Sequence, residues 1–250
     1  MSLGHLRSLL ITDPLIVLLT IGFGAVSFVV TFFDPTGRLP NKIARNWARW
    51  LLRVGRVRLT VEGLEKIDPR QSYVFVANHR SYMDTPVVLA SIPVEFRFFA
   101  KKGLFSIPFL GTHLKRAGHL AVVRGDARAS VKSMTLGAQL IQERKVSVLL
   151  FPEGGRSRTG EMREFKEGAA YIAIKAGVPL VPLGIAGTRA VLPMGSKYVR
   201  AGHVILRIGD PIPTAGVKLK DREQLTQTLV RRVAGLAGEA EPQFEAPRPA

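Results

Sequence analysis

The sequence predicts an α/β fold in which a mixed, largely parallel sheet is covered by helices and is preceded by an N-terminal, membrane-embedded helical hairpin. Two observations support this prediction. Short runs rich in Val, Ile and Phe alternate with helical segments from residue 57 to residue 210, which is the pattern of a sheet with substantial parallel content. The chain is also 46% hydrophobic while its formal net charge is +17, and its longest uncharged apolar run lies near the N-terminus.

Residues 15–33 form that apolar run and are predicted to be a helix inserted into a membrane. They carry no charged side chain, and at about 1.5 Å per residue they extend about 28 Å, close to the roughly 30 Å of bilayer hydrocarbon. A cleaved signal peptide is disfavoured because the run is long for such a segment and ends in Phe32, Phe33 and Asp34, without a small-residue cleavage site. A buried core helix is the other alternative.

A second, amphipathic helix is predicted around and after the helix-breaking residues Pro35, Gly37 and Pro40. Its apolar positions recur at helical spacing and are Leu39, Ile43, Trp47, Trp50, Leu51 and Val54. The cations on the other side are Lys42, Arg45, Arg49, Arg53 and Arg56. We expect this helix to lie in the membrane interface, with its tryptophans at headgroup depth and its cations toward anionic lipids. A solvated helix packed on the domain would show a similar pattern.

The distribution of positive charge predicts an orientation in the membrane. Arg7 is the one Lys or Arg before the apolar run, whereas several follow closely after it. Cytoplasmic segments carry the excess of Lys and Arg, so we expect a protein of the cell membrane with the bulk of the chain on the cytoplasmic face. The sequence leaves open whether the first helix spans the bilayer or whether both helices enter a single leaflet.

The remaining elements are predicted in chain order from composition and flanking residues. Strands are expected at residues 73–77, 96–100, 120–123, 146–151, 180–185 and 204–208. Helices are expected at residues 85–90, 127–143, 168–176 and 221–236. The last dozen residues, rich in Glu, Pro and Ala, are typical of a frayed tail. The sequence therefore predicts three parts: membrane-anchoring helices (1–56), an α/β domain (57–238) and a flexible tail (239–250).

Composition excludes several kinds of site. The chain has no cysteine, which rules out disulfides, thiolate metal sites and a cysteine nucleophile. Its five histidines show no ligand spacing with carboxylates, so no metal is expected. The positive charge raises nucleic-acid binding as an alternative, but no recognition-helix motif or aromatic-interleaved basic strand is present. Attraction to anionic lipids, about 1 kcal/mol per cation, explains the charge beside the apolar run.

The first candidate functional loop follows the strand predicted at residues 73–77 and contains His79, Ser81 and Asp84. Ser81 is a suitable N-cap, which would place Asp84 in the first turn of the next helix. A carboxylate there can reach the imidazole, fix its tautomer and stabilise its protonated form, as an acid–base catalyst requires. The spacing alone also fits a simple loop histidine and an aspartate favoured by the helix dipole.

The second candidate loop follows the apolar run of residues 146–150 and reads Phe-Pro-Glu-Gly-Gly-Arg-Ser-Arg-Thr-Gly from residue 151 to residue 160. Its glycines let backbone amides approach a ligand closely, and its two arginines are suited to a phosphate. It is not a nucleotide-binding P-loop, since the G-x-x-x-x-G-K-[ST] pattern is absent. Taken alone, it fits an ordinary turn with solvated charges equally well.

The two loops together contain Asn78-His79-x4-Asp84 and Phe151-Pro152-Glu153-Gly154-x-Arg156-Ser157. Further blocks follow in order: Ala100-Lys101-Lys102, Ile107-Pro108-x-x-Gly111, Gly118 to Arg124, Phe165-Lys166-x-Gly168 and Val181-Pro182-Leu183. This set resembles the signature of the glycerolipid acyltransferases, most closely the 1-acylglycerol-3-phosphate (lysophosphatidate) acyltransferases. The resemblance covers residues 55–210, and the N-terminal pair of helices is also similar to bacterial members of that family.

Three places depart from the family's usual pattern. Gly155 stands where Thr is usual, Gly103 stands where Glu is common, and residues 121–124 read Ala-Val-Val-Arg in place of Phe-Ile-Asp-Arg. These positions flank the presumed acceptor site and therefore put the identity of the acceptor in question. His79 and Asp84 are unaltered.

The resemblance implies transfer of a fatty acyl group from a thioester, acyl-CoA or acyl carrier protein, to the sn-2 hydroxyl of 1-acylglycerol-3-phosphate, giving phosphatidic acid. It implies no cofactor. We expect His79 to be the general base and Asp84 to hold the imidazole and balance its charge. The residues expected to bind the acceptor are Glu153 and Gly154 for its glycerol part, and Lys102, Arg124 and Arg156 for its phosphate.

Two other enzymatic functions are kept as alternatives. One is an acyltransferase for another lysophospholipid or for a lyso-aminolipid. The other is a Ser-His-Asp hydrolase that acts through Ser81, which is disfavoured because the G-x-S-x-G elbow is missing and a helix cap explains this serine better. A serine route would leave a covalent acyl-enzyme, whereas direct transfer would leave none.

Overall fold

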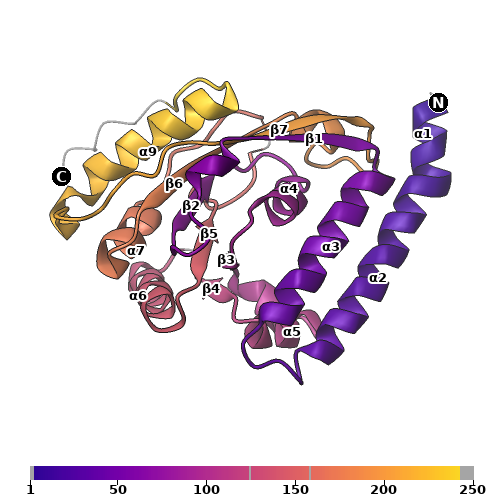
Figure 1. Cartoon of the computed structure of the whole chain (residues 1–250). Coiled ribbons are helices and arrows are strands. Elements are labelled where there is room, and N and C mark those ends of the chain that lie inside the picture. The colour runs from indigo at the N-terminus through magenta and orange to yellow at the C-terminus, as the bar shows by residue number, and fades with distance from the viewer. Residues whose placement is uncertain (1–2, 124, 158, 243–250) are drawn as a thin grey trace.

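The computed structural model describes residues 3–242 except residues 124 and 158. The strands in this part of the chain are β1 (Val57–Glu62), β2 (Val74–Ala77), β3 (Phe96–Lys101), β4 (Leu120–Val122), β5 (Ser147–Leu150), β6 (Leu180–Ala186) and β7 (Gly202–Ile208). They form a seven-stranded sheet in the order β1-β7-β6-β2-β5-β3-β4. Neighbouring strands are parallel except β6 and β7, which are antiparallel. The predicted mixed, largely parallel α/β sheet is confirmed (Figure 1).

The described helices are α1 (Leu3–Arg7), α2 (Asp13–Val30), α3 (Arg38–Val54), α4 (Asp84–Ser91), α5 (Leu110–Arg116), α6 (Ala127–Arg144), α7 (Gly168–Ala176), α8 (Thr188–Val191) and α9 (Arg222–Ala237). A π-helical turn at Ser8–Thr12 joins α1 to α2, and 3-10 turns occupy Leu64–Lys66, Lys102–Ser106 and Leu219–Asp221. Every strand and helix predicted for the domain is present to within two residues at each end. The prediction omitted β1, α5 and α8.

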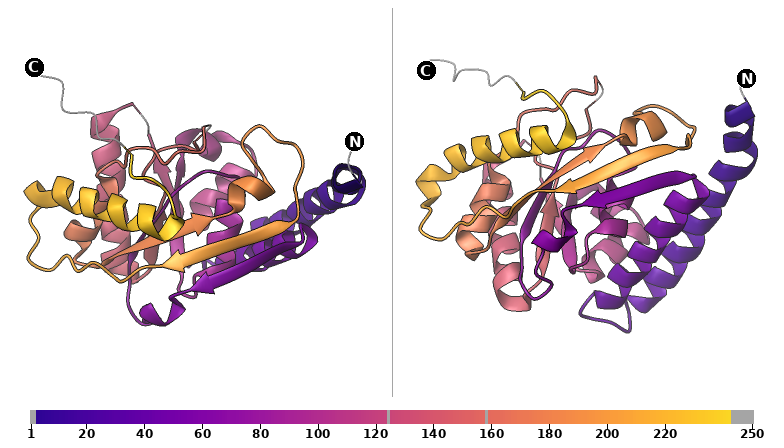
Figure 2. Two further views of the ribbon diagram at one scale, coloured as in Figure 1. Left: turned by 90° about the horizontal axis from the view of Figure 1, so that it is seen from above. Right: turned by 45° about the horizontal axis from the view of Figure 1, so that its top comes forward.

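Apolar side chains on the two faces of the sheet form two separate cores. On β2, Phe75 and Ala77 belong to the core shared with α3 and α4, whereas Val74 and Val76 belong to the core shared with α6, α7 and α9. This alternation follows from the two-residue period of a strand. A strand buried on both faces is apolar at every position, which explains the uninterrupted run in the sequence. Both views of Figure 2 show α9 and the N-terminal helices at opposite sides of the molecule.

The apolar N-terminal run is one continuous helix from α1 to the end of α2. Residues 4–30 make up the one helix of the described chain that is long and apolar enough to cross a bilayer, and only a small share of its apolar stretch is buried. This exposure excludes the alternative of a buried core helix. Both ends touch the domain: the Ser8 hydroxyl donates to the Val199 carbonyl (3.0 Å), and Arg116 Nε donates to the Thr31 carbonyl (3.0 Å). The helix therefore lies along the domain.

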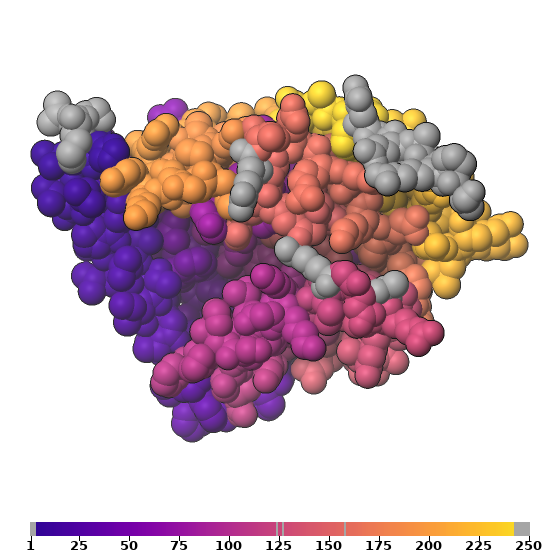
Figure 3. All heavy atoms as spheres, turned by 180° about the vertical axis from the view of Figure 1, so that it is seen from behind, coloured from indigo at the N-terminus to yellow at the C-terminus, as the bar shows by residue number. Residues whose placement is uncertain are grey.

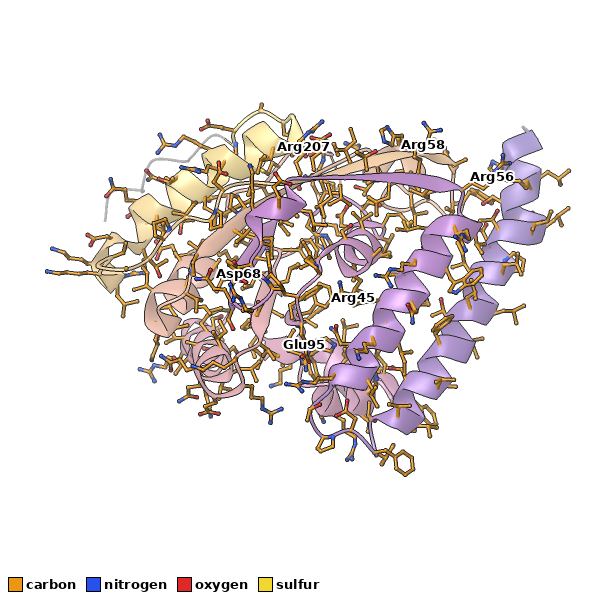
Figure 4. All side chains as sticks on the ribbon, in the orientation of Figure 1. Arg45, Arg56, Arg58, Asp68, Glu95 and Arg207 are labelled. Carbon is orange, nitrogen blue, oxygen red and sulfur yellow. The ribbon has the colours of Figure 1, made fainter. Side chains whose placement is uncertain are left out.

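α3 packs between α2 and the domain (Figure 1). Its inner side carries Ala48, Leu51 and Leu52 into the core, as expected for a helix packed on the domain. Its outer side keeps Trp50 47% exposed, as an interfacial helix requires. Arg45, labelled in Figure 4 where α3 faces the domain, donates to the Pro93 carbonyl (3.0 Å) just beyond the end of α4. The packing of α3 on the domain is therefore observed, whereas its place in a membrane interface stays a prediction.

Candidate active site

The two candidate loops lie side by side because the strands that precede them are parallel neighbours. β2 pairs directly with β5, so both loops leave the same edge of the sheet, where parallel strands place their ligand sites. Two hydrogen bonds join the loops. The Ser157 N–H donates to the His79 carbonyl (3.1 Å), and Arg156 Nε donates to the Ser81 carbonyl (3.2 Å). The sheet and these bonds fix the loops as one unit.

His79 and Asp84 form a hydrogen-bonded pair at this edge. His79 Nδ1 lies 2.9 Å from Asp84 Oδ2, and the Asp84 side chain is 1% exposed. The same oxygen accepts the Arg80 N–H (2.7 Å) and the Ser81 N–H (2.8 Å). Three donors hold Oδ2 in place, so Asp84 orients the imidazole and accepts a hydrogen bond from its Nδ1–H group. The basic lone pair of the neutral imidazole is then on Nε2.

Ser81 does not cap α4, and that prediction was wrong. The helix begins at Asp84, whose carboxylate accepts the N–H groups of the preceding loop. An acid at the N-terminal end of a helix is favoured by the helix dipole, and its charge strengthens these hydrogen bonds. The Ser81 hydroxyl instead accepts the Met83 N–H (3.0 Å) and donates to the Leu192 carbonyl (2.7 Å). Its proton is directed away from His79, which weighs against the serine hydrolase.

Phe151 is a site residue for which the sequence predicted no role, although it is the first residue of the second motif. Its ring stacks on the His79 imidazole, with centroids 3.9 Å apart and planes 15° apart. It also stacks on Phe98 at 6.4 Å. The stacking covers one face of the imidazole and limits its rotation away from Asp84. The signal in the sequence was the position of Phe151 as the first residue after a buried strand.

Glu153 is buried, with 3% of the residue exposed. Its Oε1 accepts the His79 N–H (2.5 Å) and its Oε2 accepts the Arg163 N–H (3.1 Å). Burial raises the pKa of Glu153 to about 7, the two N–H bonds oppose that rise, and the charges of Glu239 and Asp84 add to it. Glu153 thus holds the backbone of His79, and its contact with the glycerol part of a substrate stays a prediction.

Gly154 and Arg156 complete the second loop. Gly154 has φ +71°, a conformation that favours glycine, and its N–H donates to the Phe151 carbonyl (3.2 Å). The Arg156 guanidinium lies over the Tyr82 ring, 4.3 Å from its centroid. The structure therefore brings Gly154 and Arg156 to the His79–Asp84 pair. Their roles in binding an acceptor stay predictions.

The other two predicted phosphate ligands are placed differently. Lys102 is exposed at the start of the 3-10 turn after β3, and β3 is the strand beside β5, so this lysine leaves the same edge of the sheet. Arg124 lies outside the described residues. Within the described ranges, no three His, Asp or Glu side chains are grouped as a metal ion would need.

An apolar cavity of about 310 Å³ lies between the N-terminal helices and the domain. Its lining includes Phe23, Trp47, Thr85 and Phe98. Thr85 directly follows Asp84 in the chain, and Phe98 stacks on the ring next to His79. The cavity therefore connects the exposed apolar helix with the surroundings of the pair. The space-filling view in Figure 3 shows the surface hollowed between the indigo N-terminal helices and the magenta segment around α5.

A second cavity, of about 350 Å³, lies on the other side of the second loop. Phe151 and Gly154 line it together with Val131 and Met134 of α6. Three cations, Lys101, Lys166 and Arg222, also take part in its lining, as does Glu167, which is ion-paired with Arg222. These cations were not predicted as site residues, although Lys101 and Lys166 belong to the sequence blocks noted above. The cavity combines an apolar wall with groups that attract an anion.

Comparison with known proteins places this site in a family. The family model described as Acyltransferase matches residues 58–186. A chloroplastic 1-acyl-sn-glycerol-3-phosphate acyltransferase of Arabidopsis thaliana is 35% identical over 201 residues, which cover 79% of this chain and 54% of the relative. A 1-acyl-sn-glycerol-3-phosphate acyltransferase of Chlamydomonas reinhardtii is 31% identical over 229 residues, 91% of this chain and 66% of the relative. The chain thus spans little more than half to two thirds of these relatives.

A solved structure agrees over a longer range. The crystal structure of the 1-acyl-sn-glycerophosphate (LPA) acyltransferase PlsC from Thermotoga maritima matches with a TM-score of 0.78 and 25% identity, covering 98% of this chain and 100% of that one. The range matched by the family model contains both loops, with the His79–Asp84 pair and Glu153. The chain therefore belongs to the acyltransferase family.

Proposed function

We propose that this protein transfers a fatty acyl group from an acyl thioester to the sn-2 hydroxyl of 1-acylglycerol-3-phosphate and so forms phosphatidic acid. The names of the relatives and of the matching crystal structure support this activity. The observation that carries the proposal is the buried His79–Asp84 pair, 2.9 Å apart. It lies at a sheet edge flanked by two cavities with apolar walls.

In the proposed mechanism, His79 Nε2 is the general base. It takes the proton of the sn-2 hydroxyl while the hydroxyl oxygen bonds to the thioester carbonyl carbon. The tetrahedral intermediate then collapses, the C–S bond breaks, and the imidazolium returns the proton to the leaving thiolate. Asp84 accepts a hydrogen bond from Nδ1–H throughout and stabilises the imidazolium between the two steps. General-base catalysis of this kind contributes on the order of 10²–10⁴ in rate.

The oxyanion of that intermediate requires hydrogen-bond donors. The N–H groups of His79, Arg80 and Ser81 already donate to Glu153 or Asp84, so they do not serve this purpose. We assign the donors to the second loop around Gly155. A glycine there lets the substrate carbonyl approach the backbone closely.

The two cavities support a substrate that is both apolar and anionic. The cavity lined by Phe23, Trp47 and Phe98 suits an acyl chain, because each buried CH₂ group contributes about 0.8 kcal/mol. The phosphate is assigned to Arg156, Lys102 and Arg124, whose guanidinium and ammonium groups favour phosphate oxygens. The acyl donor is acyl-CoA or acyl carrier protein, and no cofactor takes part.

We further propose that the N-terminal helices enter one leaflet of the cell membrane from its cytoplasmic face. Both ends of the helix of residues 4–30 are bonded to the same domain, through Ser8 at one end and Thr31 at the other. A helix that crossed the bilayer would carry one end to the opposite side. The cations of α3 and its surroundings attract anionic lipids, and nucleic acid has no part in this account.

An assay panel tests the proposed function. Purified protein in mixed micelles receives a radiolabelled acyl-CoA or acyl carrier protein thioester and, separately, lysophosphatidate, other lysophospholipids or a lyso-aminolipid. We expect labelled phosphatidic acid and no acylated protein after acid quenching. If only a different lyso-lipid is acylated, the proposed acceptor is wrong. A labelled ester on Ser81 would contradict the proposed direct transfer and would indicate an acyl-enzyme.

A further inference from the structure

Glu239 brings a third carboxylate to the site from the segment predicted to be a tail. Its Oε1 accepts Asn78 Nδ2 (2.7 Å) and forms an ion pair with Arg80 Nη1 (2.5 Å). The Glu239 side chain is 7% exposed. Asn78 and Arg80 directly precede and follow His79, so one carboxylate oxygen bridges the two neighbours of the proposed base.

The C-terminal end of α9 places the Glu239 carboxylate at the site. Gly238 has φ +67°, and the Glu239 N–H then donates to the Ala234 carbonyl (2.9 Å), which is the usual reversal at a helix C-terminus. The last turn of the helix is bonded to the sheet, because Arg207 Nη1 on β7 donates to the Leu236 carbonyl (3.0 Å). The position of Glu239 therefore follows from the position of α9 on the sheet.

Gly184 on β6 sets how closely the end of α9 approaches. A Cβ at this position would lie 2.3 Å from the Leu236 carbonyl carbon and 2.4 Å from the Ala237 nitrogen. Both distances are shorter than any ordinary contact, so a side chain at residue 184 would displace the end of α9 outward. Glu239 would move away from Arg80 with it.

We infer that Glu239 is a positioning residue for acyl transfer, which holds the His79 loop in place through Asn78 and Arg80. This inference rests on the proposed function of His79. Asn78 has further anchors, since its amide also exchanges hydrogen bonds with the Ile185 backbone (2.8 and 2.9 Å). Arg80 depends more strongly on Glu239, because its Nε is buried and has no hydrogen-bond partner among the described residues. Loss of Glu239 would leave a largely buried guanidinium without this carboxylate beside the base.

Glu239 also adds negative charge to the surroundings of His79. It faces Asn78 and Arg80 in the first loop, Asp84 at the start of α4 and Glu153 in the second loop. Burial, and then the charge of Asp84, raise the pKa of Glu239, while Arg80 lowers it. The charge of Glu239 in turn helps to raise the pKa of Glu153. Removal of the Glu239 charge therefore lowers the pKa of Glu153. Loosened packing would lower the same pKa by reducing burial, so the variant that separates the two effects is Glu239→Gln, which removes the charge but keeps the size of the side chain.

Steady-state kinetics of three variants test this inference. Glu239→Ala removes both contacts, Glu239→Gln keeps an oxygen for Asn78 but loses the ion pair, and Glu241→Gln is a matched control at an exposed residue. We expect kcat to fall about tenfold in Glu239→Ala and less in Glu239→Gln, with both KM values nearly unchanged and the control equal to wild type. The acid-side midpoint of kcat/KM is expected to move to lower pH in both Glu239 variants and to stay unchanged in Glu241→Gln.

Gly184→Ala gives an independent route to the same result, because it should reproduce the loss of kcat and the shifted midpoint with Glu239 still in the chain. Full activity in Glu239→Ala, or a loss of kcat with an unmoved midpoint, would overturn the inference. A His79→Ala variant in the same series separates the two proposals. If His79→Ala is inactive while Glu239→Ala is fully active, only the role of Glu239 fails, whereas an active His79→Ala overturns the proposed function itself.

Discussion

Backbone N–H groups around His79 are held by two acidic side chains that come from different loops. Asp84 accepts the N–H groups of Arg80 and Ser81 as well as the imidazole. Glu153 accepts the N–H of His79 itself. Each carboxylate therefore holds the loop before any substrate binds, which fixes the proposed base, His79, in one geometry.

Arg156 is expected to bind the acceptor's phosphate. In Arg156→Ala, we expect KM for lysophosphatidate to rise at least about tenfold, because a charge-assisted hydrogen bond contributes about 1.5–3 kcal/mol. KM for the thioester donor should change little, since that substrate does not use the phosphate site. Initial-rate kinetics with each substrate varied in turn provide the measurement. An unchanged KM for the acceptor would refute this role.

The raised pKa of Glu153 leads us to expect a pH dependence of activity. Its pKa is raised to about 7, so the ionised form that accepts two N–H groups is lost as the pH falls through that value. We expect kcat/KM to decline on the acid side with a midpoint near this pKa. The folded protein binds the proton more tightly than the unfolded chain, whose ordinary value is 4.5, so this group lowers the free energy of unfolding as the pH rises from 4.5 through about 7. A flat activity profile across neutral pH would contradict this assignment.

Among the elements, β1 and α5 show why parts of the fold were not predicted. β1 does alternate apolar and polar residues, Val-Arg-Leu-Thr-Val-Glu, but it directly follows the basic helix, and half of its residues are polar because it is an edge strand. α5 begins after Phe109, a non-glycine residue with φ +61°. Backbone strain of that kind is imposed by tertiary packing and leaves no pattern in the sequence.

The N-terminal helices allow a direct test of how they meet the membrane. The chain has no cysteine, so a single introduced thiol can be labelled without background. In sealed inside-out vesicles, we expect a membrane-impermeant maleimide to label Gly4→Cys and Arg38→Cys. Both residues are exposed, Gly4 near the start of the apolar helix and Arg38 at the turn that leads into α3. Leu18→Cys, in the middle of the apolar helix and 64% exposed in the protein, should be protected by lipid.

Labelling of those two ends from opposite sides of the vesicle membrane would contradict the single-leaflet arrangement. Free labelling of Leu18→Cys in intact vesicles would contradict insertion altogether. Detergent-solubilised protein provides the control, because all three thiols should then react at similar rates.

For the whole molecule, we expect the positive charge and the exposed apolar helix to bind a membrane together. We expect high salt to leave the protein in the membrane fraction, because screening weakens ionic attraction but not the burial of apolar side chains in lipid. Detergent should release it. Release by salt alone, as for a basic nucleic-acid-binding protein, would contradict this account.

The sequence predicts those parts of the site that depend on local order along the chain. His79, Asp84, Glu153, Gly154 and Arg156 leave adjacent parallel strands, and the structure places them together at one edge. Other parts depend on packing between distant segments: Glu239 reaches the site only because α9 docks closely on β6. The error at Ser81 has a related cause, since the start of α4 at Asp84 is set by the folded loop, in which the Asp84 carboxylate accepts the Arg80 and Ser81 N–H groups.

Proton transfer from the acceptor hydroxyl to His79 is the central claim, and the turnover rate of His79→Ala tests it most directly. The variant should keep its circular dichroism spectrum and its membrane attachment, because the imidazole is a loop side chain outside both cores. With lysophosphatidate and an acyl thioester, we expect kcat to fall by on the order of 10²–10⁴. A well-folded His79→Ala protein that retains a kcat close to that of the wild type would contradict the account.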